Sequence, residues 1–222
     1  MLYIVSTPIG NLKDITLRAL EVLETVDLIA AEDTRHSKIL LDHYQIATPL
    51  TSYFEHNEKK KAGYLVGLLK EGKNIALVTD AGTPGISDPG YRLVSLCREN
   101  EISMTVIPGP CALIAALSLS ALPTDSFIFA GFLPVKSGGR KKRLEEFANE
   151  TRTVILYESP HRLLKTLKDL QEIFPNTEVV VAREITKKFE EVRRGKASEL
   201  LAHFSKTSPK GEFVLLLARG PR

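Results

Sequence analysis

Short apolar runs alternate with segments of helical periodicity along almost the whole chain, and this alternation limits the possible folds more than any other feature. Such alternation is typical of α/β proteins with a largely parallel sheet. In the first half, the expected strands are residues 2–6, 28–31, 74–78 and 103–107. Two expected helices begin at the capping residues Asp14 and Thr34. Three others cover residues 57–69, 91–99 and 112–119.

The helical period breaks at residues 120–125, Ser-Ala-Leu-Pro-Thr-Asp, and this break predicts a domain boundary. We therefore expect an N-terminal α/β domain with a largely parallel sheet over residues 1–119 and a C-terminal α/β domain with a mixed sheet over residues 120–222. The second domain has expected strands at 127–132, 153–157, 178–182, 187–194 and 213–218. One helix is expected after Gly139 and another from Ser159, with Pro160 in its first turn.

The composition is that of an ordinary globular protein, because 43% of the 222 residues are hydrophobic and 26% are charged. The net charge of +3 does not identify an anionic partner, so the positions of the charges must decide. Cys97 and Cys111 fit neither a metal spacing nor a disulfide framework, and we expect no metal site. The sequence has no basic leader and no apolar run of the ~18–20 residues that a membrane helix needs, which predicts a cytoplasmic protein.

Residues 78–90 read Val-Thr-Asp-Ala-Gly-Thr-Pro-Gly-Ile-Ser-Asp-Pro-Gly and follow the expected strand 74–78 directly. The segment is long for a simple reversal of direction, because median connections have about 4–6 residues. Glycines at the carboxyl end of a parallel strand let the backbone approach a ligand closely. We interpret the segment as a ligand-binding loop; the alternative is an unusually long structural loop.

Two further turns also follow expected strands, at residues 6–11 and 108–112. Neither contains the Gly-x-Gly-x-x-Gly fingerprint, and no P-loop occurs in the sequence, so a nicotinamide dinucleotide or P-loop site is disfavoured. Glu32 and Asp33 lie at the distance where an acidic group binds a ribose in nucleotide folds, which is weak support for a nucleotide-like ligand. The second turn, Pro-Gly-Pro, fits a ligand contact at a helix N-terminus and a purely structural helix start equally well.

Longer motifs occur in six segments: STPIGNLKDIT (6–16), AEDTR (31–35), DAGTPGISDPG (80–90), PGP (108–110), GFLP (131–134) and YESPHR (157–162). Together they resemble the bacterial small-subunit ribosomal RNA cytidine-2′-O-methyltransferases, from residue 2 to about residue 219. These enzymes belong to the tetrapyrrole-methylase superfamily, the class III methyltransferases. The resemblance implies a two-domain α/β enzyme, usually a homodimer, with S-adenosylmethionine in a cleft between the domains. The implied substrate is a cytidine ribose in 16S ribosomal RNA of the small subunit.

The resemblance also implies which residues bind the cofactor, largely through backbone atoms. They are Pro8, Ile9, Asp80, Gly82, Thr83, Ile86, Cys111, Ala112, Tyr157, Ala182 and Glu212. Because an attacking oxygen only has to be held in line with the methyl group, positioning can supply most of the acceleration.

A base near the ribose hydroxyl would help the reaction, and three carboxylates at expected strand ends are candidates: Asp33, Glu158 and Glu184. For each of them we favour the alternative, an ion pair with the nearby Arg35, Arg162 or Arg183.

Basic residues are concentrated in residues 136–143, around a pair of glycines. Cations at a helix N-terminus oppose the helix dipole, which favours RNA contact over a merely solvated helix start. The residues proposed for RNA contact are Lys136, Arg140, Lys141, Lys142, Arg143, Arg35, His161 and Arg162. His161 also fits a capping role in the first turn of its expected helix.

Two other functions stay open at this point. One is a methyltransferase that acts on a tetrapyrrole, a corrin or porphyrin precursor; it would need a broad apolar trough rather than a basic loop. The other is a non-catalytic RNA-binding protein on the same fold, against which the intact 80–90 loop argues. Calorimetry with S-adenosylmethionine separates the second of these from an enzyme.

Overall fold

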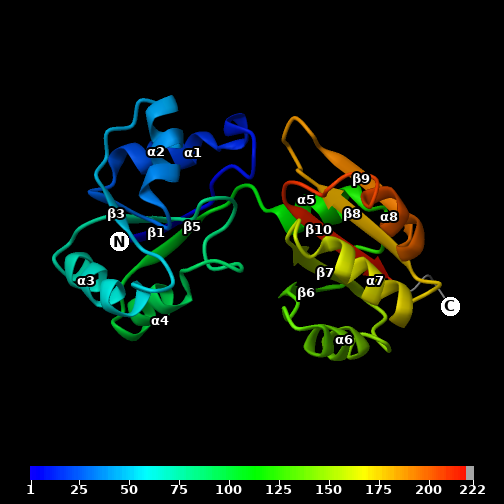
Figure 1. Ribbon diagram of the computed structural model, residues 1–222. Coiled ribbons are helices and arrows are strands. Elements are labelled where there is room, and N and C mark those ends of the chain that lie inside the picture. Colours follow the sequence, from blue (N-terminus) through cyan, green and yellow to red (C-terminus); the bar gives the residue numbers. More distant parts are fainter. Residues whose placement is uncertain (219–222) are drawn as a thin grey trace. The chain divides into compact units, whose positions relative to one another are not determined.

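The computed structural model describes residues 1–218 of the chain. The chain divides into two compact units, and the division falls between Cys111 and Ala112 (Figure 1). This boundary precedes the one expected after residue 119. The reason is that helix α5 (Ala112–Leu119) packs on strands β7 (Thr153–Glu158) and β10 (Phe213–Ala218) of the second unit.

The first unit has a five-stranded sheet in the order β3-β2-β4-β1-β5, and every neighbouring pair in it is parallel. Its strands are β1 (Leu2–Val5), β2 (Leu28–Ala31), β3 (Leu50–Ser52), β4 (Ile75–Val78) and β5 (Met104–Ile107). All four residues of β4 are buried, as expected for a strand covered on both faces.

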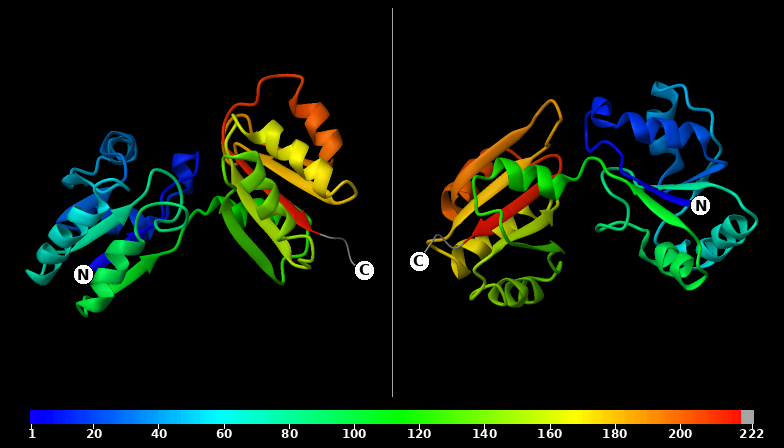
Figure 2. Two further views of the ribbon diagram at one scale, coloured as in Figure 1. Left: turned by 60° about the horizontal axis from the view of Figure 1, so that its bottom comes forward. Right: turned by 180° about the vertical axis from the view of Figure 1, so that it is seen from behind.

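Helices cover both faces of this sheet (Figures 1 and 2). The pair α1 (Leu17–Thr25) and α2 (Thr34–His43) packs on one face, and the pair α3 (Glu58–Lys70) and α4 (Tyr91–Glu99) packs on the other. Each strand therefore alternates its side chains between two apolar layers. The expected largely parallel α/β arrangement of the N-terminal part is thereby confirmed.

The second unit has a mixed sheet in the order β6-β7-β10-β8-β9, in which β6 (Phe127–Phe132) and β7 run parallel and the other neighbours run antiparallel. The remaining strands are β8 (Glu178–Arg183) and β9 (Glu191–Lys196). One face packs against α6 (Ser137–Glu145), α7 (Leu163–Ile173) and α8 (Ala197–Phe204), and α5 covers part of the other face.

Several expected boundaries were wrong for local reasons. Thr16, not Asp14, caps α1, because residues Leu12–Asp14 form a separate 3-10 turn. Helix α7 begins at Leu163, because residues 159–162 form a turn in which the Ser159 carbonyl accepts from the N–H groups of Arg162 and Leu163.

Other differences concern edge elements of the sheets. The outer strand covers Glu191–Lys196, since residues 187–190 form a turn before it. Asp33 caps α2 in place of Thr34. The short β3 and α8 were not expected from the sequence. None of the helices in the described part of the chain has the length and apolar character needed to span a bilayer.

Candidate functional site

Three turns meet at the carboxyl edge of the first sheet. They follow β4, β1 and β5, which are neighbours in the sheet, and parallel strands end at the same edge. Thr7 and Gly82 exchange two backbone hydrogen bonds, of 2.9 and 3.1 Å. The hydroxyl of Thr83 lies 3.0 Å from that of Ser6 and donates over 3.3 Å to the Pro110 carbonyl. The three turns therefore form one connected structure.

The residues proposed for the cofactor in the first unit all lie on these turns. Pro8 and Ile9 are buried, whereas Ile86 is exposed. Gly82 has a φ of +89°, a backbone conformation that residues with a side chain rarely adopt. A Cβ on Gly90 would lie 3.0 Å from the backbone nitrogen of Gly85, so the loop is folded tightly on itself. The sequence needs glycine here to place backbone groups close together at this edge.

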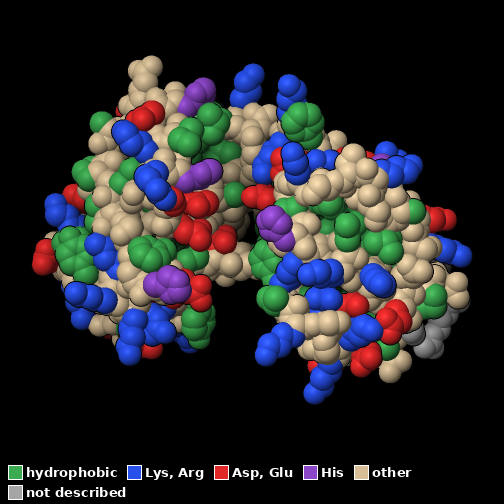
Figure 3. Space-filling model, viewed as in Figure 1, with side chains coloured by type: hydrophobic (Ala, Val, Ile, Leu, Met, Phe, Trp, Pro, Cys, Tyr) green, Lys and Arg blue, Asp and Glu red, His purple; other side chains and the backbone are tan. Residues whose placement is uncertain are grey.

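The same edge is acidic where β2 joins it (Figure 3). Glu32 Oε2 accepts a hydrogen bond of 2.6 Å from the Thr79 hydroxyl, and Asp80 Oδ1 accepts one of 3.1 Å from the Asp33 backbone. Burial, together with the nearby charge of Glu32, raises the pKa of Asp80 above its ordinary value of 3.8. An edge that crowds carboxylates in this way favours a positively charged ligand.

A cavity of about 590 Å³ lies beside this loop. It is lined in part by the acidic residues Glu32, Glu55, Glu58, Asp88 and Glu99. Glu58 is fixed by the Tyr53 hydroxyl at 2.9 Å and by the Gly90 and Arg92 N–H groups at 3.4 and 3.3 Å. Residues 87–90 of the loop thus form one wall of an acidic hollow, which none of the residues proposed for the cofactor lines.

In the second unit, Tyr157 and Ala182 flank Val214 in one row across β7, β10 and β8. Glu212 precedes β10 at the same edge, where its backbone exchanges hydrogen bonds with Glu184. Tyr157, Ala182 and Glu212, which are separated by up to 55 positions in the sequence, therefore lie together at one end of the second sheet.

The three candidate bases are held in ion pairs. Asp33 binds Arg35 at 2.7 Å, and these hydrogen bonds lower the pKa of Asp33 to about 2. Glu184 and Glu212 share Lys187, so Arg183 was the wrong partner for Glu184; Arg183 pairs with Glu191 at 3.6 Å. Burial raises the pKa of Glu184, but the Glu212 N–H and Lys187 outweigh it and hold that pKa below its ordinary value.

Glu158 is the most constrained of the three, because its side chain is buried. Its oxygens accept from the Ser159 N–H at 2.8 Å, Arg162 Nε at 2.7 Å and the Thr166 hydroxyl at 2.5 Å. This arrangement matches the structural alternative and fixes the turn that carries His161. One nitrogen of Arg162, Nη2, is buried and has no acceptor among the described residues.

The basic segment 136–143 divides into two kinds of residue. Arg140 is 3% exposed and forms an ion pair with Asp169 of α7 at 2.6 Å, so its proposed RNA contact was wrong. The signal was available in the sequence, since Arg140 shares a helical face with Leu144 and Phe147.

The remaining cations of this segment are accessible to different extents. Lys141 binds Glu172 at 2.6 Å, and Arg143 pairs with Glu146. Lys136 and Lys142 are exposed and make no ion pair within residues 1–218. Figure 3 shows Lys and Arg side chains gathered around α6 on this face of the second unit. A basic surface thus exists there, with fewer free cations than the sequence indicated.

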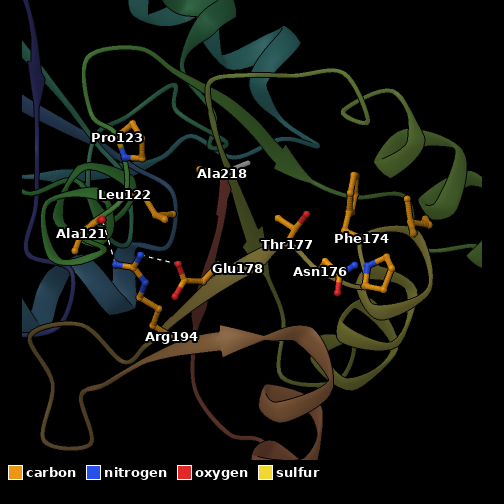
Figure 4. A pocket seen from close by; sticks show the side chains of 11 residues that line it. Ala121, Leu122, Pro123, Phe174, Asn176, Thr177, Glu178, Arg194 and Ala218 are labelled. Atoms are coloured by element: carbon orange, nitrogen blue, oxygen red, sulfur yellow. Dashed lines mark hydrogen bonds and ion pairs between the residues drawn. The ribbon is translucent and has the colours of Figure 1, made fainter. Parts of the chain in front are cut away.

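A larger cavity, of about 870 Å³, lies at the opposite end of the second sheet (Figure 4). Arg194 projects into it and bridges Glu178 at 2.6 Å and the Ala121 carbonyl at 3.1 Å. Because Glu178 already neutralises this guanidinium, the cavity presents no uncompensated charge within the described chain. No residue proposed from the sequence lies in it.

Comparisons with known proteins agree with this geometry. Residues 1–201 match the family model described as tetrapyrrole (corrin/porphyrin) methylases. A Synechocystis sp. protein named ribosomal RNA small subunit methyltransferase I is 54% identical over 219 residues, which cover 98% of this chain and 78% of that protein. A protein of the same name from Thermotoga maritima is 50% identical over 217 residues and is covered to 97%, against 98% of this chain.

Among solved structures, the chain is similar to a uroporphyrin-III C-methyltransferase from Thermus thermophilus complexed with S-adenyl homocysteine. The TM-score is 0.69 at 17% sequence identity, and the match covers 98% of this chain and 97% of that one. At this identity the likeness shows the fold alone. That fold is the two-domain class III methyltransferase architecture expected from the motifs.

Proposed function

The chain belongs to the tetrapyrrole (corrin/porphyrin) methylase family, with ribosomal RNA small subunit methyltransferases I as relatives at 49–54% identity, and on this premise we propose that it methylates 16S ribosomal RNA. The acceptor is the 2′-hydroxyl of a cytidine, and the donor is S-adenosylmethionine. The observation that carries this proposal is the convergence of the Thr7, Gly82 and Pro110 turns at one sheet edge.

The residues at that edge fit the donor in shape and charge. A Cβ on Gly82 would lie 3.5 Å from the Ile9 side chain and 3.8 Å from the Pro110 carbonyl oxygen. Because glycine has no Cβ, the space between these two groups stays open. The neighbouring Asp80 and Glu32 suit a ligand whose sulfonium and amino groups are positive. We propose that Pro8, Ile9, Asp80, Gly82, Thr83, Ile86, Cys111 and Ala112 hold the donor, together with Tyr157, Ala182 and Glu212.

S-adenosylmethionine supplies a methyl group activated by its positively charged sulfur. The chain's own contribution is then to orient the ribose, since Asp33, Glu158 and Glu184 are each committed to an ion pair. A carboxylate with a pKa of about 2, as for Asp33, is also a weak base at neutral pH. We therefore assign most of the acceleration to positioning, which can supply about 7–11 kcal/mol in well-oriented reactions.

The substrate side of the proposal is supported by the exposed Lys136, Lys142, Arg143 and His161 of the second unit. Lysines on a surface neutralise phosphates and make binding depend on salt. Ribosomal subunits are assembled in the cytoplasm, so the reaction belongs there. We also propose a homodimer, which sedimentation equilibrium tests directly.

Radiolabelled S-adenosylmethionine and small subunits that lack this methylation test the proposal. The expected result is label in 16S RNA, mapped by nuclease digestion to one cytidine whose 3′ bond resists alkali. Label on a base, or label only when a tetrapyrrole is supplied, contradicts it. A protein that binds the donor in calorimetry but transfers no methyl to subunits or their free RNA also contradicts it.

A further inference from the structure

Strand β6 is an edge strand of the second sheet and carries aromatic residues. A β-bulge in it determines the face of the sheet to which these side chains point. Its pairing with β7 shifts between Phe129, opposite Ile155, and Phe132, opposite Tyr157. Within the bulge, Gly131 has a φ of +62°. Side chains alternate between faces along a strand, so an unbroken strand would point Phe129 and Phe132 to opposite faces. The bulge brings both to the face opposite α6, because bulges re-aim side chains.

The result is a cluster of three rings, which we call the aromatic platform: Phe129, Phe132 and Tyr157. The ring centroids lie 4.8 Å apart for Phe129 and Tyr157 and 5.8 Å apart for Phe132 and Tyr157, both edge to face. Phe132 is nevertheless 55% exposed. Its ring is held in place by Tyr157 while much of its surface faces solvent.

Packing alone does not account for this arrangement. The core under α6 takes Leu133, Leu144 and Phe147 from the same region, and these are buried. A residue that served the core would be directed there by an unbroken strand, whereas the bulge turns Phe132 away from it. Phe132 is not isolated, because its ring joins those of Tyr157 and Phe129 in one apolar cluster, and an exposed cluster of this kind indicates a binding surface.

Basic side chains follow both strands that carry the platform, and the acidic residue next to Tyr157, Glu158, is buried and paired with Arg162. Lys136 follows β6 and is exposed, and His161 and Arg162 follow β7. Aromatic rings with cations beside them are the usual binding surface for single-stranded nucleic acid.

We propose that the aromatic platform stacks an unpaired base of the RNA substrate on Phe132, with a neighbouring phosphate contacted by the exposed Lys136. This inference rests on the proposed function and adds to it the residues that recognise the RNA strand. It makes Phe132 a substrate-binding residue of the GFLP motif. The competing occupant is the adenine of the donor, which the experiment distinguishes.

The experiment compares Phe132→Ala, Phe132→Trp and the matched control Phe127→Ala. Phe127 lies on the same strand, is 37% exposed and is not part of the platform. For each variant, kcat and KM for small subunits are measured, together with the Kd for S-adenosylmethionine by calorimetry. We expect Phe132→Ala to raise the KM for subunits by roughly 5- to 150-fold, which corresponds to the loss of one base stack. Phe132→Trp should retain most of the affinity, and Phe127→Ala should match the wild type.

Two outcomes overturn the inference. One is an unchanged KM in Phe132→Ala; the other is a donor Kd that rises as much as the KM does, which assigns the ring to the cofactor. Equilibrium binding of the same variants to fluorescently labelled small subunits, without donor, measures the contribution of the platform to RNA affinity independently of catalysis. If the wild type transfers no methyl group, the proposed function fails, and this binding measurement still decides the platform.

Discussion

The hydroxyl oxygens of Ser6 and Thr83 lie 3.0 Å apart although 77 positions separate the two residues in the chain. Thr83 also donates to the Pro110 carbonyl, so one side chain connects the turns after β1, β4 and β5. This contact fixes the relative positions of the turns that we propose hold the donor.

Replacing Thr83 with Val keeps its shape and removes both hydrogen bonds. We expect the Kd for S-adenosylmethionine to rise about 2- to 10-fold, because a hydrogen bond contributes about 0.5–1.5 kcal/mol. Calorimetry measures this change. Thr25→Val is the control, since the Thr25 hydroxyl donates to the Glu21 and Val22 carbonyls of its own helix, and it should leave the Kd unchanged. Equal Kd values for both variants and the wild type would remove Thr83 from the site.

Gly82 and Gly72 form a matched pair, because their φ angles are +89° and +88°. Alanine at either position should lower the free energy of unfolding by about 1–2 kcal/mol, the cost of a left-handed conformation. Gly72 lies in the turn after α3 with nothing within 4 Å of the added Cβ. Only Gly82→Ala should also lose donor affinity. Urea denaturation and calorimetry on both variants separate the two effects, and donor binding that survives in Gly82→Ala contradicts the proposed contact.

Arg140→Ala should destabilise the protein by about 3–5 kcal/mol, because it leaves Asp169 charged and buried without its partner. Lys142 lies two residues further along α6 and is exposed, so Lys142→Ala should change stability by no more than about 0.5 kcal/mol. The double variant Arg140→Met with Asp169→Leu should recover most of the loss, because it removes both charges. Thermal unfolding checks all three, and a wild-type midpoint for Arg140→Ala would refute the buried pair.

The raised pKa of Asp80 predicts that the free energy of unfolding depends on pH. Its pKa is raised in the folded protein, mainly by burial, so folding favours the protonated form. The resulting stability is present below the ordinary pKa of 3.8 and is lost as the pH rises through the folded pKa. Asp80→Asn keeps the oxygen that accepts from Asp33 and cannot ionise. The variant should therefore gain stability relative to the wild type between acidic and neutral pH, as measured by thermal unfolding across that range, while it loses donor affinity. A difference that stays constant with pH would show that Asp80 does not titrate as described.

Local signals in the sequence were sufficient for much of the fold. The buried strand at residues 75–78 was predicted correctly, and the glycines of the 78–90 loop adopt the left-handed conformations that set glycine apart from other residues. Element boundaries were predicted less accurately where a side chain bonds to backbone groups. Glu158 does this in the turn before α7, where it accepts from the Ser159 N–H. That arrangement depends on Thr166, one turn into the next helix, and periodicity does not reveal it.

The sequence by itself determined the alternation of strands and helices, the turns that follow the parallel strands at one end of the sheet, and the family to which the chain belongs. Only the tertiary structure decided which charged groups are free. Arg140 and Lys142 are close in the chain, yet Asp169 reaches only Arg140, because α7 packs against the face of α6 on which Arg140 lies. The direction of Phe132 was decided in the same way, by strand pairing across the bulge at Gly131. Propensity and periodicity are local properties, whereas ion pairing and exposure depend on partners that are distant in the sequence.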